Sequence, residues 1–190
     1  MKRKWKLWMI AFVVFVMTDI MMQSNRAEAK KRTFTVSSKT IPCSSSYRQK
    51  PYYNKKTKQY YMINSYMRRL STTGGTLKLK KGTYKIPGTI YVPSNVKIVC
   101  ANGVKIKKTK ATGTKKVKST KFLFQMISEE KASGKQNTGK YAASKNASIQ
   151  GNGKVIFDMG NVNGATAVFV GHASGITVTV SYTHLTLPTT

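Results

Sequence analysis

The stretch Gly74–Lys107 reads GGTLKLKKGTYKIPGTIYVPSNVKIVCANGVKIK and decides the fold class expected for this chain. It contains five short β-type runs separated by Gly, Pro and Asn-Gly: Thr76–Leu79, Thr83–Ile86, Thr89–Val92, Val96–Cys100 and Val104–Ile106. Apolar and polar residues alternate in most of these runs, which is the period of a strand with one buried face. Runs this short, with turn residues every few positions, favour a coiled sheet over a flat meander or a helical domain.

Three motifs follow one another in this stretch: Gly-Gly-Thr-Leu at 74–77, Lys-Gly-Thr-Tyr at 81–84 and Tyr-Val-Pro-Ser-Asn-Val at 91–96. Their order resembles the first coils of pectate-lyase-like right-handed parallel β-helices, and the resemblance extends from Tyr60 to Val180. It implies an all-β solenoid, a right-handed parallel β-helix, with an N-terminal capping α-helix. Many members of that superfamily cleave or bind acidic polysaccharides, although function belongs to sites carried by a fold and not to the fold itself.

An irregular internal repeat supports the coiled arrangement without the resemblance. Asn146–Phe157 echoes Asn95–Ile106 with a one-residue slip, since each has an Asn, a strand, an Asn-Gly turn and a second strand. Two later runs continue the series: Thr166–Val170 and Ile176–Val180. Irregular repetition with insertions is typical of a solenoid. We therefore expect three residues to occupy equivalent inward positions in successive or near-successive coils: Ile98, Ile149 and Ile176.

The segments around the strands complete the expected domain organisation. Residues 30–53 form a basic lead-in, 54–72 the capping helix, and 73–180 the first coils of the β-helix. The helix is indicated by an apolar face formed by Tyr60, Ile63, Met67 and Leu70. Asn54 is the candidate cap at its start, and Gly74-Gly75 end the segment. The last ten residues, 181–190 (SYTHLTLPTT), depart from the pattern, and we interpret them as a non-native tail on a C-terminally truncated chain.

The N-terminus is typical of a secretory signal peptide at residues 1–29. A basic segment precedes the apolar run Leu7–Met17, and Ala27-Glu28-Ala29 resembles a cleavage site. Because Asp19 interrupts the apolar run short of the ~20 residues that a membrane span needs, we expect no stable membrane anchor. The sequence predicts cleavage before Lys30 and a secreted or cell-wall-associated protein.

Two cysteines, Cys43 and Cys100, remain in the exported chain. Export permits a disulfide between them. The alternative is that Cys100 is a small buried hydrophobic residue, on the same strand face as Val96 and Ile98.

Positive charge is the unusual feature of the composition. The chain has 34 Lys and Arg residues against five Asp and Glu, a formal net charge of +29, and signal cleavage leaves +26. Such a balance favours anionic partners. The expected binding residues are outward-facing lysines of the strands: Lys78, Lys97 and Lys105. The expected partner is an anionic polysaccharide or cell-wall polymer, while a lysine face that only keeps the protein soluble is the alternative. The absence of a recognised binding motif argues against specific nucleic-acid binding.

Catalytic chemistry has few candidates in this sequence. The mature chain has three carboxylates, of which Glu129 and Glu130 are adjacent on an expected polar loop and Asp158 lies at an expected turn. Gly171-His172-Ala173 resembles the Gly-His-Gly of polygalacturonase-like proteins only faintly, and their Asn-Thr-Asp and Arg-Ile-Lys motifs do not occur. The spacing of His and Cys fits no metal site. We therefore expect no catalytic residues, metal or cofactor in this chain.

Two functions remain open at this point. The favoured one is the N-terminal part of an exported β-helix protein, a polysaccharide lyase or glycoside hydrolase, whose catalytic coils are not in this chain. The alternative is a non-catalytic cationic adhesin that binds anionic wall polymer or host glycan.

Overall fold

Strands dominate the structure, and all pairings between the described strands are parallel. The computed structural model describes residues 31–133 and 143–186, with the backbone alone for 180–186. The expected signal peptide and cleavage site lie outside these ranges. Three helices lie within the described residues: α2 (Ser45–Arg48), α3 (Lys58–Leu70) and α4 (Glu129–Ser133). The all-β prediction is confirmed, as parallel sheets that curl like half a barrel around one core.

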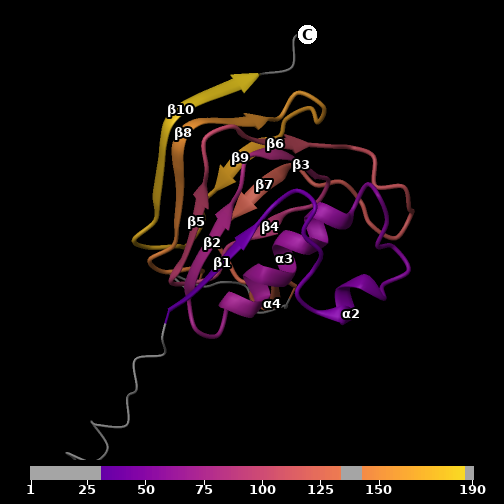
Figure 1. Ribbon diagram of the computed structural model, residues 1–190, viewed down its shortest axis with the longest axis horizontal. Helices are drawn as coiled ribbons and strands as arrows, with labels where there is room; N and C mark the ends of the chain where they lie inside the picture. Colours follow the sequence, from indigo (N-terminus) through magenta and orange to yellow (C-terminus); the bar gives the residue numbers. More distant parts are fainter. Residues whose placement is uncertain (1–30, 134–142, 187–190) are drawn as a thin grey trace, which may run out of the picture. The chain divides into compact units, whose positions relative to one another are not determined.

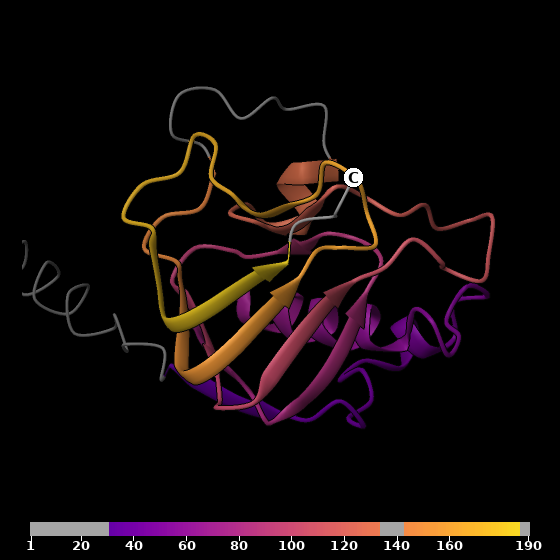
Figure 2. The same cartoon turned by 90° about the horizontal axis from the view of Figure 1, so that it is seen from above.

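Successive passes of the chain place the strands in three parallel rows. The first row contains β1 (Arg32–Val36), β2 (Gly75–Leu79), β5 (Val96–Cys100) and the first half of β8 (Ser148–Asp158). The second row contains β3 (Gly82–Ile86), β6 (Val104–Lys108) and the second half of β8. The third row contains β4 (Ile90–Tyr91), β7 (Phe122–Gln125) and β9 (Thr166–Phe169). β10 (Thr177–Thr186) pairs along both halves of β8. Figure 1 shows the first row and Figure 2 the second, each with its strands side by side.

The alternation seen in the sequence directs one face of each row into a shared core. Leu77, Ile98 and Ile149 lie opposite one another on adjacent strands, and each is almost completely buried. Tyr84 and Ile106 do the same in the second row. Burial of one such aliphatic side chain contributes about 1.5–3 kcal/mol, so the stacked inward residues provide much of the stability.

The expected equivalence of Ile98 and Ile149 is confirmed, but that of Ile176 is wrong. Val178 lies opposite Ile149, and Ile176 lies two residues earlier in the chain. A residue with positive φ precedes each of the strands β2, β5, β8 and β10: Gly74 (67°), Asn95 (59°), Asn146 (53°) and Gly175 (62°). Gly and Asn adopt this conformation most readily. Gly175 is thus the counterpart of Asn146, and Val178, three residues later, is the counterpart of Ile149.

Helix α3 covers part of the sheets by packing against β2, β3 and β4 (Figure 1). It begins at Lys58, later than the predicted residue 54, because Asn54 forms a turn in which its Oδ1 accepts the N–H of Lys56 at 2.8 Å. Ile63, Met67 and Leu70 are buried as predicted, whereas Tyr60 is only half-buried. A side-chain hydrogen bond connects the helix to the start of β4, since Asn64 Nδ2 donates to Thr89 O at 3.3 Å.

Two boundaries differ from the sequence prediction. β8 runs without interruption through the predicted turn at Asn152-Gly153, with Gly153 at φ 80° inside the strand. β10 continues to Thr186, and the backbone of residues 182–186 pairs with that of 154–158. The expectation that the pattern ends at Val180 is therefore wrong for the backbone of residues 181–186. Parallel pairing uses backbone N–H and C=O groups, which every non-proline residue supplies.

Both cysteines have free thiols in this structure, so the disulfide expected as one possibility is not formed. Cys100 is completely buried in the first row, and burial raises the pKa of its thiol to about 12. Cys43 is exposed, and its backbone N–H donates to Ser65 Oγ at 3.0 Å. The interpretation of Cys100 as a small core residue agrees with this position.

Candidate functional site

The three lysines singled out from the sequence do not form one column. Lys78 on β2 and Lys97 on β5 are both exposed on the outer face of the first row, but Lys78 lies opposite Val99 and Lys97 opposite Thr76. Lys105 lies in the second row, where its Nζ is 2.9 Å from Asp158 Oδ2. Strand periodicity correctly gives the face of each lysine, but the row and the register come from pairing between distant segments.

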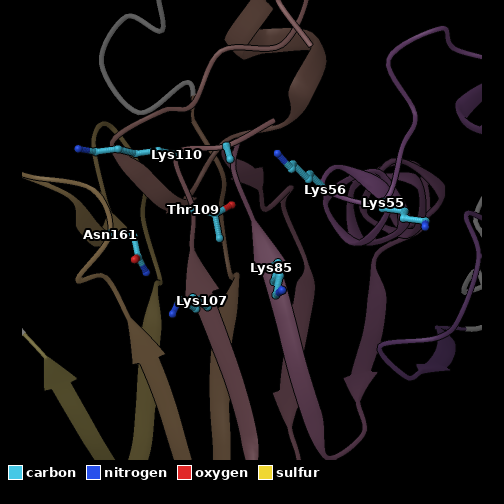
Figure 3. Close-up of a pocket in the computed structure, with 8 residues that line it drawn as sticks. Lys55, Lys56, Lys85, Lys107, Thr109, Lys110 and Asn161 are labelled. Carbon is cyan, nitrogen blue, oxygen red and sulfur yellow. The ribbon is translucent and has the colours of Figure 1, made fainter. Parts of the chain in front are cut away.

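A different group of lysines surrounds a pocket of about 530 Å³, here called the lysine pocket: Lys55, Lys56, Lys85, Lys107 and Lys110, with Thr109, Ala111 and Asn161. The residues come from the turn before α3, from β3, from β6 and the segment after it, and from the turn after β8. Figure 3 shows Lys56 reaching towards the strand ends, while the ammonium group of Lys55 points away from them. No carboxylate is among the residues that line the pocket.

The base of the pocket is formed by two lysines held side by side. Lys85 on β3 and Lys107 on β6 are directly opposite in the parallel register. Neighbouring strands lie about 4.8 Å apart, and like charges directly opposite each other repel. The fold therefore places two lysine side chains on adjacent strands, where their like charges disfavour the folded state and a bound anion would favour it.

Asp158 is the carboxylate nearest to this group. Its Oδ2 lies 2.9 Å from Lys105 Nζ and 3.8 Å from Lys107 Nζ, and its Oδ1 accepts the N–H of Gly160 at 3.3 Å. Although partial burial opposes ionisation, the Lys105 ammonium and the Gly160 N–H hold the pKa of Asp158 below its usual value. Among the residues that the structure describes, Lys56, Lys85 and Lys110 form no ion pair, so the pocket keeps an excess of positive charge.

Beside the pocket, Lys108 is fully buried, which sequence analysis missed. Its Nζ donates to Phe122 O at 2.7 Å, to Thr120 Oγ1 at 3.1 Å and to Gly88 O. Burial lowers the pKa of Lys108 to about 7. Lys108 is the last residue of β6, so it lies on the inward face of a strand and not in a solvated loop. Its position could have been found, since Lys108 continues the alternating series of Val104 and Ile106.

These hydrogen bonds fix the wall of the pocket. Lys108 ties the end of β6 to both the turn after β3 and the start of β7, while Thr109, Lys110 and Ala111 follow it directly in the pocket lining. Thr109 N–H donates in turn to Ile86 O at 3.3 Å. The pocket thus rests on hydrogen-bonded backbone next to the core.

A second basic pocket, here called the arginine pocket, has a volume of about 800 Å³ and includes Arg32, Arg68, Arg69 and Lys50. Arg68 Nε lies 3.7 Å from Glu130 Oε1, and the Tyr47 hydroxyl donates to Glu129 Oε2 at 3.0 Å. The two glutamates belong to helix α4, not to the loop that the sequence suggested. Each is engaged with a different side chain, so the two do not form a carboxylate pair around a shared substrate position.

Residues 31–133 and 143–186 contain no cluster of His, Cys, Asp and Glu side chains that could hold a metal ion. Within the same ranges, no helix has the length and hydrophobicity required to span a membrane. Comparison of the chain with family models, curated proteins and solved structures gives no match.

Proposed function

We propose that this chain belongs to an exported parallel β-helix protein that binds acidic polysaccharide through the lysine pocket. Support for the β-helix comes from the three strand rows, since the passes β2–β4 and β5–β7 each add one strand to each row. Support for export comes from the signal-like pattern of residues 1–29. The pectate-lyase-like motifs at residues 74–96 favour a glycan as the partner.

One observation carries the binding proposal. Five lysines line one pocket that has no carboxylate in its lining, and two of them are held opposite each other by strand register. Concentrated charge of one sign raises the local concentration of counter-ions and favours a polyanion over a neutral glycan. A sugar polymer with repeated negative charges fits because it can continue beyond the pocket over the lysines on the outer faces of the strands.

Binding without cleavage is the form of this function that the described residues favour. Glycan hydrolysis uses a pair of carboxylates on either side of the scissile bond. Here Asp158 is paired with Lys105, and Glu129 and Glu130 lie with the arginine pocket residues Tyr47 and Arg68. An adhesin-like role on an anionic wall polymer or host glycan follows, and a hydrolase activity would require a different arrangement of carboxylates from that of the described residues.

The proposal is tested by measuring affinity for polygalacturonate and for a phosphate-bearing wall polymer at several salt concentrations. The variant Lys85→Gln/Lys110→Gln removes two pocket charges, and Lys78→Gln/Lys97→Gln removes two exposed charges from the first row. We expect the pocket variant to lose at least tenfold in affinity for the polymer that binds and the control to lose less than threefold. Equal losses in the two variants would show that net charge alone causes binding, since exposed charges act on a polyanion through a screened field.

A further inference from the structure

We propose that the lysine pocket recognises phosphate monoesters carried by sugars in preference to the carboxylates of uronic acids. This inference rests on the proposed function in one respect, because it takes the pocket as the place where the acidic groups of the glycan bind. It adds the chemical identity of those groups, which decides the class of polysaccharide.

The amount of charge in the pocket is the first argument. Lys56, Lys85 and Lys110 have no ion-pair partner among the described residues, and Lys107 shares Asp158 with the closer Lys105. A uronate brings one negative charge to this group. A phosphate monoester brings about −1.5 to −2 at pH 7 together with three strong acceptor oxygens. The phosphate therefore neutralises the pocket more completely with a single substituent.

The type of cation is the second argument. All five cationic residues of the pocket are lysines, whereas Arg32, Arg68 and Arg69 line the arginine pocket. A guanidinium group matches the planar carboxylate through two parallel hydrogen bonds, whereas an ammonium group acts as a point charge with three rotatable donors. Lysine side chains from β3, β6 and the turn before α3 line the pocket, and ammonium groups of this kind can contact a tetrahedral anion without requiring one plane of approach. The all-lysine composition of the pocket therefore suits phosphate better than carboxylate.

Asp158, the carboxylate beside the pocket, provides a test in which a substitution should increase the affinity for phosphate. Asp158 lies 3.8 Å from Lys107 Nζ and thus contributes negative charge at the edge of the pocket. Replacing it by Asn removes that charge with little change in shape. Asp158→Asn is expected to strengthen phosphate binding three- to tenfold, because a doubly charged ligand is repelled by Asp158 more strongly than a singly charged one.

The experiment uses titration calorimetry of the secreted chain with glucose 6-phosphate and with galacturonate, each at pH 5 and pH 7. We expect glucose 6-phosphate to bind at least tenfold more tightly than galacturonate at pH 7. Its affinity should rise severalfold between pH 5 and 7, because the second phosphate ionisation has a pKa near 6. Galacturonate is fully ionised over this range, so it reports any titration of the protein itself, including that of Lys108.

The outcomes separate this inference from the proposed function. If glucose 6-phosphate binds as expected and Lys85→Gln/Lys110→Gln removes the preference, the inference stands, whatever the polymers do. If galacturonate binds equally well or better, the inference is wrong, while polygalacturonate binding would still support the proposed function. If neither sugar binds at millimolar concentration, the pocket is no anionic-sugar site and the inference is wrong as well.

Discussion

Replacement of the buried Lys108 by Met should change how the stability of this protein depends on pH. Lys108 is fully buried and donates to three oxygens, and burial lowers its pKa from 10.5 to about 7. Above pH 7 the native state has lost this proton, while the unfolded chain keeps it up to about pH 10. The unfolded state therefore binds more protons in this window, and the free energy of unfolding rises with pH.

The magnitude follows from the two pKa values. Each pH unit in which only the unfolded state is protonated adds about 1.4 kcal/mol to the free energy of unfolding. Between pH 7 and 9 the gain is about 2 kcal/mol, since Lys108 is only half deprotonated in the native state at pH 7. Above pH 9 the buried thiol of Cys100 acts in the opposite direction, because its pKa is raised from 9.0 to about 12. The window from pH 7 to 9 is thus the one in which Lys108 can be isolated.

The assay is urea unfolding followed by circular dichroism at pH 6, 7, 8 and 9, for the wild-type chain, Lys108→Met and the control Lys78→Met. The control removes the same charge from an exposed position on β2. We expect the difference in unfolding free energy between wild type and Lys108→Met to change by about 2 kcal/mol from pH 7 to 9. The difference for Lys78→Met should stay constant within about 0.5 kcal/mol. A constant difference for Lys108→Met would refute the burial of an ionisable amine at this position.

Three further predictions concern packing, register and export. Gly75→Ala should lower the unfolding free energy by more than about 2 kcal/mol in denaturant titration, because its Cβ would lie 2.2 Å from Arg32 O at φ 130°; Gly164→Ala, also at positive φ but with 3.9 Å of clearance, should lose only about 1 kcal/mol. Ile98→Asp should cost about 3–5 kcal/mol by burying an unpaired charge. Val178→Asp should cost less than about 1 kcal/mol because Val178 is 44% exposed, and similar losses in the two variants would contradict this exposure. Mass spectrometry of secreted material should show a mature N-terminus at Lys30, and an intact Met1 would disprove the predicted cleavage.

Much of the fold could be predicted from local patterns. Alternation in Gly74–Lys107 identified the strands and their inward faces, and Leu77, Ile98 and Ile106 are all buried as that pattern requires. The turn residues were also informative, because Asn95 and Asn146 adopt the positive φ that precedes β5 and β8. These features depend on a few consecutive residues, so they are present in the sequence itself.

The candidate site depended on longer-range information. Lys78, Lys97 and Lys105 were chosen by face, and the face is correct for Lys78 and Lys97, which are exposed. The pocket instead joins Lys56 with Lys85 and Lys107, which lie about 30 and 50 positions further along the chain. Nothing in the local pattern of any of these segments specifies the other two.

By itself, the sequence of this protein determined where most strands lie, that one side of each is apolar and that its charge is strongly positive. The tertiary structure decided which strands became neighbours, and so which lysines lie together and which lysine is buried. The physical reason is that side-chain alternation is fixed within each strand by backbone geometry, with a period of two residues. Register is fixed between strands, by the length of the connecting loops and by the residue that takes the left-handed conformation at each turn. Strand pairing placed Val178 opposite Ile149, and two further residues of β6 placed Lys108 in the core beside a pocket of lysines.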